Sequence, residues 1–173
     1  MKINSEYFNQ LFEGAVNNRT VIIDCVLDQY VVSNHDRSKV IGRPTLYFAI
    51  DKSIRMIRAF HLSIDGNLEE AHKALLEAII LNKEEQIPAC FEISKSSIKP
   101  GIEQLLTKYN FAFSLVPERN KFNAEREIRD IQQNIDNSNE GNASEQRFLT
   151  LDELNTIINN WATTKKEKMT SNS

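Results

Sequence analysis

Hydrophobic positions along the chain follow two different periods. From residue 20 to residue 64 they alternate with polar positions or form short continuous runs, which predicts strands over 20–27, 30–33, 45–50 and 55–64. After Asp65-Gly66 the apolar positions recur every three or four residues, which predicts a helix from Asn67 to about Leu81. Strands over 88–93 and 111–116 are then expected to alternate with helices over 98–109 and 118–135.

Both ends of the chain carry helical patterns. Apolar residues share one helical face over 3–13, and Thr150 to Glu153 form a capping box that opens a helix reaching Trp161. The pattern predicts a core with an N-terminal helix over 1–136, a polar linker over 137–147, a C-terminal helix over 148–165 and a flexible tail over 166–173.

The order of elements predicts an α/β fold with a mixed central sheet. Three antiparallel strands are followed by two βα units, and helices flank the sheet. This is the order found in the ribonuclease H-like fold, although several other α/β folds can be drawn through the same pattern.

Composition narrows the class of protein. The 173 residues are 40% hydrophobic and 26% charged, which is typical of one folded domain and excludes wholesale disorder. The formal net charge of −3 argues against a domain that holds nucleic acid by bulk charge alone, but it leaves room for a local basic face.

The chain is expected to be cytoplasmic and to have no membrane partner. It has no apolar run long enough to span a bilayer, and residues 1–20 lack the pattern of a signal peptide. Cys25 and Cys90 lie within apolar runs and are interpreted as buried thiols. The three histidines have no metal-like spacing, so no zinc site is expected.

Three carboxylates stand out as candidate chemistry. Asp24 interrupts an apolar strand, where a charge is costly unless it is paired, hydrogen-bonded or bound to a metal. It either bonds a neighbouring turn or ligates a divalent cation. Glu92 closes a second strand, and Glu125 lies near the start of a helix. Acids in this order can hold two metal ions for phosphoryl transfer.

Several segments resemble the integrase core of bacterial DDE transposases, especially the Mu and Tn7 types. They are Ile-Ile-Asp-Cys-Val-Leu-Asp over 22–28, Ile-Gly-Arg-Pro-Thr-Leu-Tyr-Phe-Ala-Ile-Asp over 41–51, Ser-Ile-Arg-Met over 53–56 and Ala-Glu-Arg over 124–126. The resemblance covers about residues 18–165. It implies a ribonuclease H-like fold, Mg²⁺- or Mn²⁺-dependent DNA strand transfer, DNA as a partner, and either self-association or binding to transposase subunits.

The resemblance assigns roles to the same three acids, with one departure. Asp24 matches the first acid of the family and Glu125 the third. The family has Asp-Asn-Gly at the second acid, whereas Glu92-Ile93-Ser94 stands at the best-fitting place here. Because two-metal sites are sensitive to sub-ångström placement, the longer side chain at Glu92 weakens the expectation of catalysis.

Three hypotheses on function stay open at this point. The chain is an active DDE-type polynucleotidyl transferase, a non-catalytic relative that binds DNA or a transposase subunit, or an interaction domain whose helix over 150–161 docks a partner. The family's flanking domains for recognition of transposon ends are not found, so a truncated and catalytically impaired transposase core is the favoured reading.

Basic residues near the predicted site are the candidates for DNA contact. A charge cluster of this kind either tracks phosphates or keeps a surface soluble. The candidates are Arg43, Lys52, Arg55, Lys95, Lys121 and Arg126. Asp51 is expected to cap the turn to Ser53 or to pair with Arg55.

Overall fold

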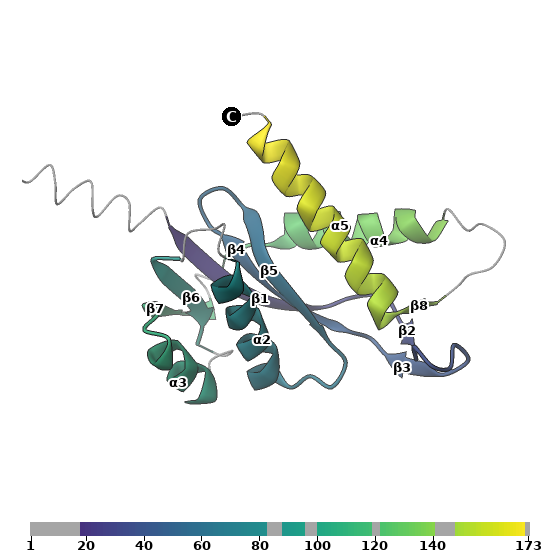
Figure 1. The fold of residues 1–173 in the computed structure, drawn as a ribbon, viewed down its shortest axis with the longest axis horizontal. Coiled ribbons are helices and arrows are strands. Elements are labelled where there is room, and N and C mark those ends of the chain that lie inside the picture. The colour runs from purple at the N-terminus through teal and green to yellow at the C-terminus, as the bar shows by residue number, and fades with distance from the viewer. Residues whose placement is uncertain (1–17, 83–87, 96–99, 119–121, 141–147, 172–173) are drawn as a thin grey trace, which may run out of the picture. The chain divides into compact units, whose positions relative to one another are not determined.

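The computed structural model describes residues 18–82, 88–95, 100–118, 122–140 and 148–171. The helix predicted over 3–13 lies outside these ranges. The elements in chain order are β1 (Arg19–Val26), β2 (Val31–Val32), β3 (Val40–Gly42), β4 (Thr45–Asp51), β5 (Met56–Ser63), α2 (Leu68–Leu81), β6 (Cys90–Ser94), α3 (Pro100–Lys108), β7 (Phe113–Val116), α4 (Glu125–Glu140), β8 (Leu149–Thr150) and α5 (Leu151–Thr170) (Figure 1).

A five-stranded mixed sheet has the strand order β5-β4-β1-β6-β7. β1 and β6 are parallel, and so are β6 and β7. β4 and β5 are neighbours joined by the four-residue turn Lys52–Arg55, which is the connection of an antiparallel hairpin. The predicted mixed α/β architecture is therefore confirmed.

A second sheet of three short strands was not predicted. β2 pairs antiparallel with β3 and parallel with β8, so the order is β3-β2-β8. Val31 of β2 lies opposite Leu149 of β8, far along the chain. β2 lies within the strand predicted over 30–33. β3 and β8 are too short to carry a recognisable period, and a pairing over such a sequence separation has no local signal.

The chain forms two compact units. The first contains residues up to Ile23, 48–60 and 68–122, and the second contains 24–47, 61–67 and 123–173. In the first unit, α2 and α3 bury their apolar faces against β1, β4 and β6. The buried residues of this core are Ile22, Ala49, Leu75, Leu76, Ile79, Phe91, Ile93, Ile102 and Leu106.

The second unit is built around the helices α4 and α5, which pack against each other (Figure 1). Ile131 and Ile135 of α4 are buried, and so are Leu154, Ile158 and Trp161 of α5. The apolar face of α5 therefore packs within the chain. This removes the reason for expecting that face to dock a separate partner.

The bounds of both helices differ from the predicted ones, and both helices extend further toward the C-terminus than predicted. α4 begins at Glu125 rather than at 118, because Asn123 accepts a hydrogen bond from the Glu125 backbone N–H at 2.9 Å, and it continues to Glu140, into the predicted linker. α5 continues to Thr170, into the predicted flexible tail. Lys165 holds this last part to Asp130 of α4 at 2.6 Å. None of the described helices is long and apolar enough to cross a membrane.

The capping box at the start of α5 supports a first prediction. The Thr150 hydroxyl accepts from the Glu153 N–H at 3.2 Å, and Glu153 accepts from the Thr150 N–H at 2.9 Å. Replacing Thr150 with Ala should lower the free energy of unfolding by about 0.5–2 kcal/mol, because the hydroxyl partner of the Glu153 N–H is lost. Urea unfolding measures this. Thr150→Ser, which keeps the hydroxyl, should recover most of the loss, and equal losses in both variants would contradict the role of the cap.

Candidate functional site

Glu92 lies at the centre of the three parallel strands of the first unit. In register it faces Val21 of β1 on one side and Ser114 of β7 on the other. The residue is buried, at 5% exposure. A carboxylate in this position needs compensating partners, since an unpaired buried charge is costly.

Two cations supply that compensation. Arg19 donates from Nη1 to Glu92 Oε1 at 2.9 Å, and Lys52 donates from Nζ to Oε2 at 3.0 Å and to Oε1 at 3.3 Å. Burial alone would raise the pKa of Glu92, but the hydrogen bonds from Arg19 and Lys52 and their positive charges outweigh it and hold the pKa below its usual value. Glu92 is thus ionised, and both of its oxygens are engaged.

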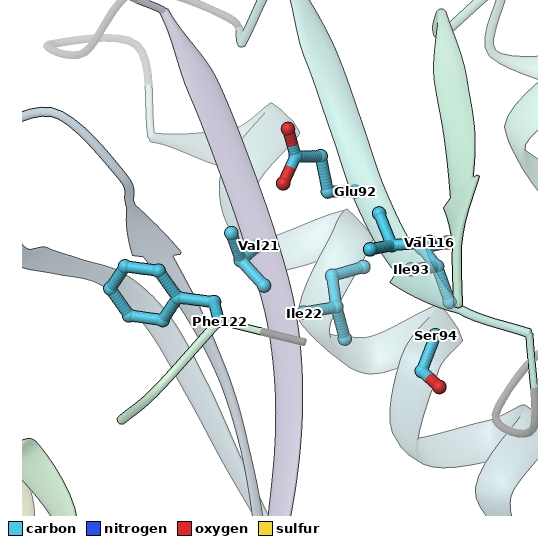
Figure 2. A pocket seen from close by; sticks show the side chains of 7 residues that line it. All are labelled: Val21, Ile22, Glu92, Ile93, Ser94, Val116 and Phe122. Atoms are coloured by element: carbon cyan, nitrogen blue, oxygen red, sulfur yellow. The ribbon is translucent and has the colours of Figure 1, made fainter. Parts of the chain in front are cut away.

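A shallow hollow of about 260 Å³, counted with its open side, lies next to Glu92. In Figure 2 the carboxylate sits at one end and Ser94 at the other, with apolar side chains between them. The remaining lining residues are Val21, Ile22, Ile93, Val116 and Phe122. Ser94 donates to Glu118, so its hydroxyl is engaged as well. The lining is mainly apolar and contains one carboxylate.

The other two predicted acids belong to the second unit. Asp24 is half-buried in the last part of β1, and Glu125 is exposed at the first position of α4. Burial raises the pKa of the neighbouring Cys25 thiol to about 12, and the charges of Asp24 and Asp28 add to the shift. The raised pKa makes Cys25 a poor nucleophile, although Cys25 and Cys90 are each half-buried, and not fully buried as the sequence suggested.

Neither strand neighbour of Glu92 in the register of the sheet is an acid. Its partner on β1 is Val21, three positions before Asp24. Because successive side chains of a strand alternate, Val21 and Asp24 point to opposite faces of β1. Among the described residues, no group of three His, Cys, Asp or Glu side chains is placed to hold a metal ion. Glu92 bonds two cations, and the other side chains that line the hollow beside it are apolar except Ser94. This set of groups lacks the further carboxylates that hold Mg²⁺.

The candidates for DNA contact fall into two groups. Three of them are engaged within the chain: Arg43 with Asp28 at 2.5 Å and with the Leu27 carbonyl at 2.9 Å, Lys52 with Glu92, and Arg55 over the Phe122 ring at 4.7 Å. Lys95 and Arg126 are exposed. Lys121 lies outside the described residues.

The sequence did not indicate the roles of Arg19 and Arg58. Arg19 was not singled out, because it lies 73 positions from Glu92 and no local pattern links the two residues. Asp51 caps the turn to Ser53 as expected, accepting from the Ser53 N–H at 3.0 Å, but its ion-pair partner is Arg58 and not Arg55. The reason is local backbone geometry, since Arg55 has a φ of 56° and its guanidinium stacks on Phe122.

The Asp51 interactions predict a dependence of stability on pH. Burial would raise the pKa of Asp51, but the hydrogen bonds from Ser53 and Arg58 outweigh it and lower the pKa. A lowered pKa gives stability that is present above the unfolded-state value of about 3.9 and is lost as the pH falls through the folded-state value. The wild type should therefore lose more of its free energy of unfolding than Asp51→Asn does as the pH falls from about 5 to about 2, so the difference between the two proteins should shrink. Urea titrations across this range measure it, and a constant difference would contradict the assignment.

The fold is that of the catalytic cores of retroviral integrases. The integrase core of HTLV-2, solved in complex with magnesium, superposes with a TM-score of 0.55 at 14% identity over 82% of each chain. The integrase core of BIV superposes with a TM-score of 0.51 at 8% identity, over 82% of this chain and 80% of that one. The predicted ribonuclease H-like fold is confirmed.

The sequence matches are to the Tn7 transposition protein TnsB and to a family model named after its C-terminal domain. Residues 23–101 match the family model described as the TnsB C-terminal domain. The Tn7 transposition protein TnsB of Escherichia coli is 50% identical over 41 residues, which are 24% of this chain and 6% of that protein. The match thus spans a small part of the length of TnsB. Together with the fold, these findings agree with a divergent DDE transposase core and bear out the resemblance drawn from the sequence.

Proposed function

We propose that this chain is a transposase-core component of DNA transposition that binds DNA without cutting it. The observation that carries the proposal is the match of residues 23–101 to the TnsB C-terminal domain, combined with the cation pairs that occupy Glu92. TnsB is named as a transposition protein, and we infer from this name that the partner of the chain is DNA.

The contacts of Glu92 favour the non-catalytic form of this function. A catalytic form would need Asp24, Glu92 and Glu125 to converge on Mg²⁺ or Mn²⁺, as in the family, with both Glu92 oxygens released from Arg19 and Lys52. DNA binding has no such requirement. Lys95 and Arg126 are exposed cations that suit phosphate contacts, and Arg43 can contribute from its exposed position beside Asp28.

A plasmid assay tests the proposal. Supercoiled DNA incubated with the chain and Mg²⁺ or Mn²⁺ should show no nicking above the level of an Asp24→Asn variant. Nicking by the wild type that disappears in Asp24→Asn would contradict the non-catalytic form.

DNA binding is measured separately by gel shift over a range of salt concentrations. The affinity should fall as salt rises, because phosphate contacts release counterions. Lys95→Gln and Arg126→Gln should each weaken binding, with Lys73→Gln on the exposed side of α2 as the control. Absence of any salt-dependent shift would contradict the proposed partner.

A further inference from the structure

We infer that Arg19 and Lys52 are built-in counter-ions of Glu92, and that they assemble this part of the sheet without a divalent cation. The three residues form a single cluster, called here the Glu92 clamp. All three residues belong to the first unit.

The clamp joins three separate pieces of the sheet. Arg19 is the first residue of β1, Lys52 follows the last residue of β4, and Glu92 is the middle residue of β6. The backbone supports the same arrangement, because the Lys52 N–H donates to the Arg19 carbonyl at 2.8 Å. The carboxylate therefore connects the ends of two strands to the centre of a third.

The accessibility of the three side chains differs in a way that suits this role. The Glu92 side chain is 6% exposed, whereas those of Arg19 and Lys52 are 39% and 45% exposed. The side chains of Arg19 and Lys52 therefore remain partly hydrated, whereas the Glu92 carboxylate is almost completely shielded from water. Such an arrangement limits the desolvation cost to one charge and neutralises that charge on both oxygens.

A divalent cation would have to displace Arg19 and Lys52 from the Glu92 carboxylate in order to bind it. Mg²⁺ gives up its water reluctantly and is held by carboxylates in near-octahedral geometry. The strand neighbours of Glu92 are Val21 and Ser114, neither of which is a carboxylate. Arg19 and Lys52 are tethered at hydrogen-bond distance, so their effective concentration is high.

Melting experiments with a double-mutant cycle test the inference. Lys52→Met should lower the melting temperature of the wild type and lower it much less in the Glu92→Gln background, because the partner is already gone. Arg19→Met should behave in the same way. Lys73→Met, on exposed α2, should show no coupling to Glu92→Gln. If Lys52→Met or Arg19→Met fails to fold, Lys52→Gln and Arg19→Lys replace them in the cycle.

Metal titration completes the test. Melting of the wild type in millimolar Mg²⁺ or Mn²⁺ should equal melting in EDTA at the same ionic strength, and the cation variants should not be rescued by metal. Coupling without a metal effect supports the clamp. Additive effects of the substitutions would overturn it, and so would a metal-dependent rise that Glu92→Gln abolishes. The inference does not require DNA binding, so its failure and that of the proposed function are read from different experiments.

Discussion

Replacing Arg58 with Met should lower the free energy of unfolding by about 3–5 kcal/mol, among the largest effects expected for a charged residue in this chain. Arg58 of β5 pairs with Asp51 at the end of β4, and the two side chains are only 8% and 5% exposed. The substitution leaves the Asp51 carboxylate buried without its ion-pair partner, which is far more costly than losing an exposed pair. Arg58 also donates to Asn18 at 3.0 Å, so a second contact is lost.

Urea unfolding followed by circular dichroism measures this effect. The matched control is Lys73→Met, which removes an exposed pair with Glu77 at 4.0 Å and should change stability by no more than about 0.5 kcal/mol. The double variant Asp51→Asn/Arg58→Met should lose less than the sum of the single losses, because the two residues share one interaction. A loss below about 1 kcal/mol in Arg58→Met would mean that the pair is not buried.

Replacing Leu154 with Ala should destabilise the second unit by about 2–5 kcal/mol. Leu154 lies in the first half of α5 and is fully buried, on the same helical face as Ile158 and Trp161. Truncation removes buried apolar surface and leaves a cavity in a region that packs α5 against α4. An effect of this size is expected only if the apolar face of α5 is part of the chain's own core.

The single tryptophan makes this test specific to one unit. Trp161 is the only Trp in the sequence and belongs to the second unit, so its fluorescence reports unfolding there. The fluorescence transition should move to lower urea in Leu154→Ala. Asn155→Ala, one residue further along and exposed, should leave it nearly unchanged. An unchanged transition in Leu154→Ala would revive the view that α5 docks a separate partner.

Elements of the five-stranded sheet and of the helices α2 and α3 could be predicted because their burial follows their period. Leu75 and Ile79, for example, recur at helical spacing and are both buried on one face of α2. β3 and β8, which both pair with β2, could not be predicted, since strands of three and two residues carry no pattern of their own. The end of α5 was missed because Lys165 gains a partner, Asp130, that only the tertiary structure supplies.

The candidate site shows the same division between local and tertiary information. The sequence could single out Asp24 and Glu92 as charges within apolar strands, because that anomaly is local. It could not give the partners of Glu92, because Arg19 is 73 positions away and meets it only through the β1–β6 register. Whether an acid meets a metal or a cation depends on that register, and one residue of shift moves the side chain to the other face.

A crystal structure of the chain grown in Mn²⁺, with anomalous data collected for the metal, tests the central claim most directly. We expect an integrase-like core in which Glu92 bonds Arg19 and Lys52, with no anomalous peak at its carboxylate. A manganese peak within coordination distance of Glu92, with either cation displaced, would contradict the account and return the three acids to a catalytic role.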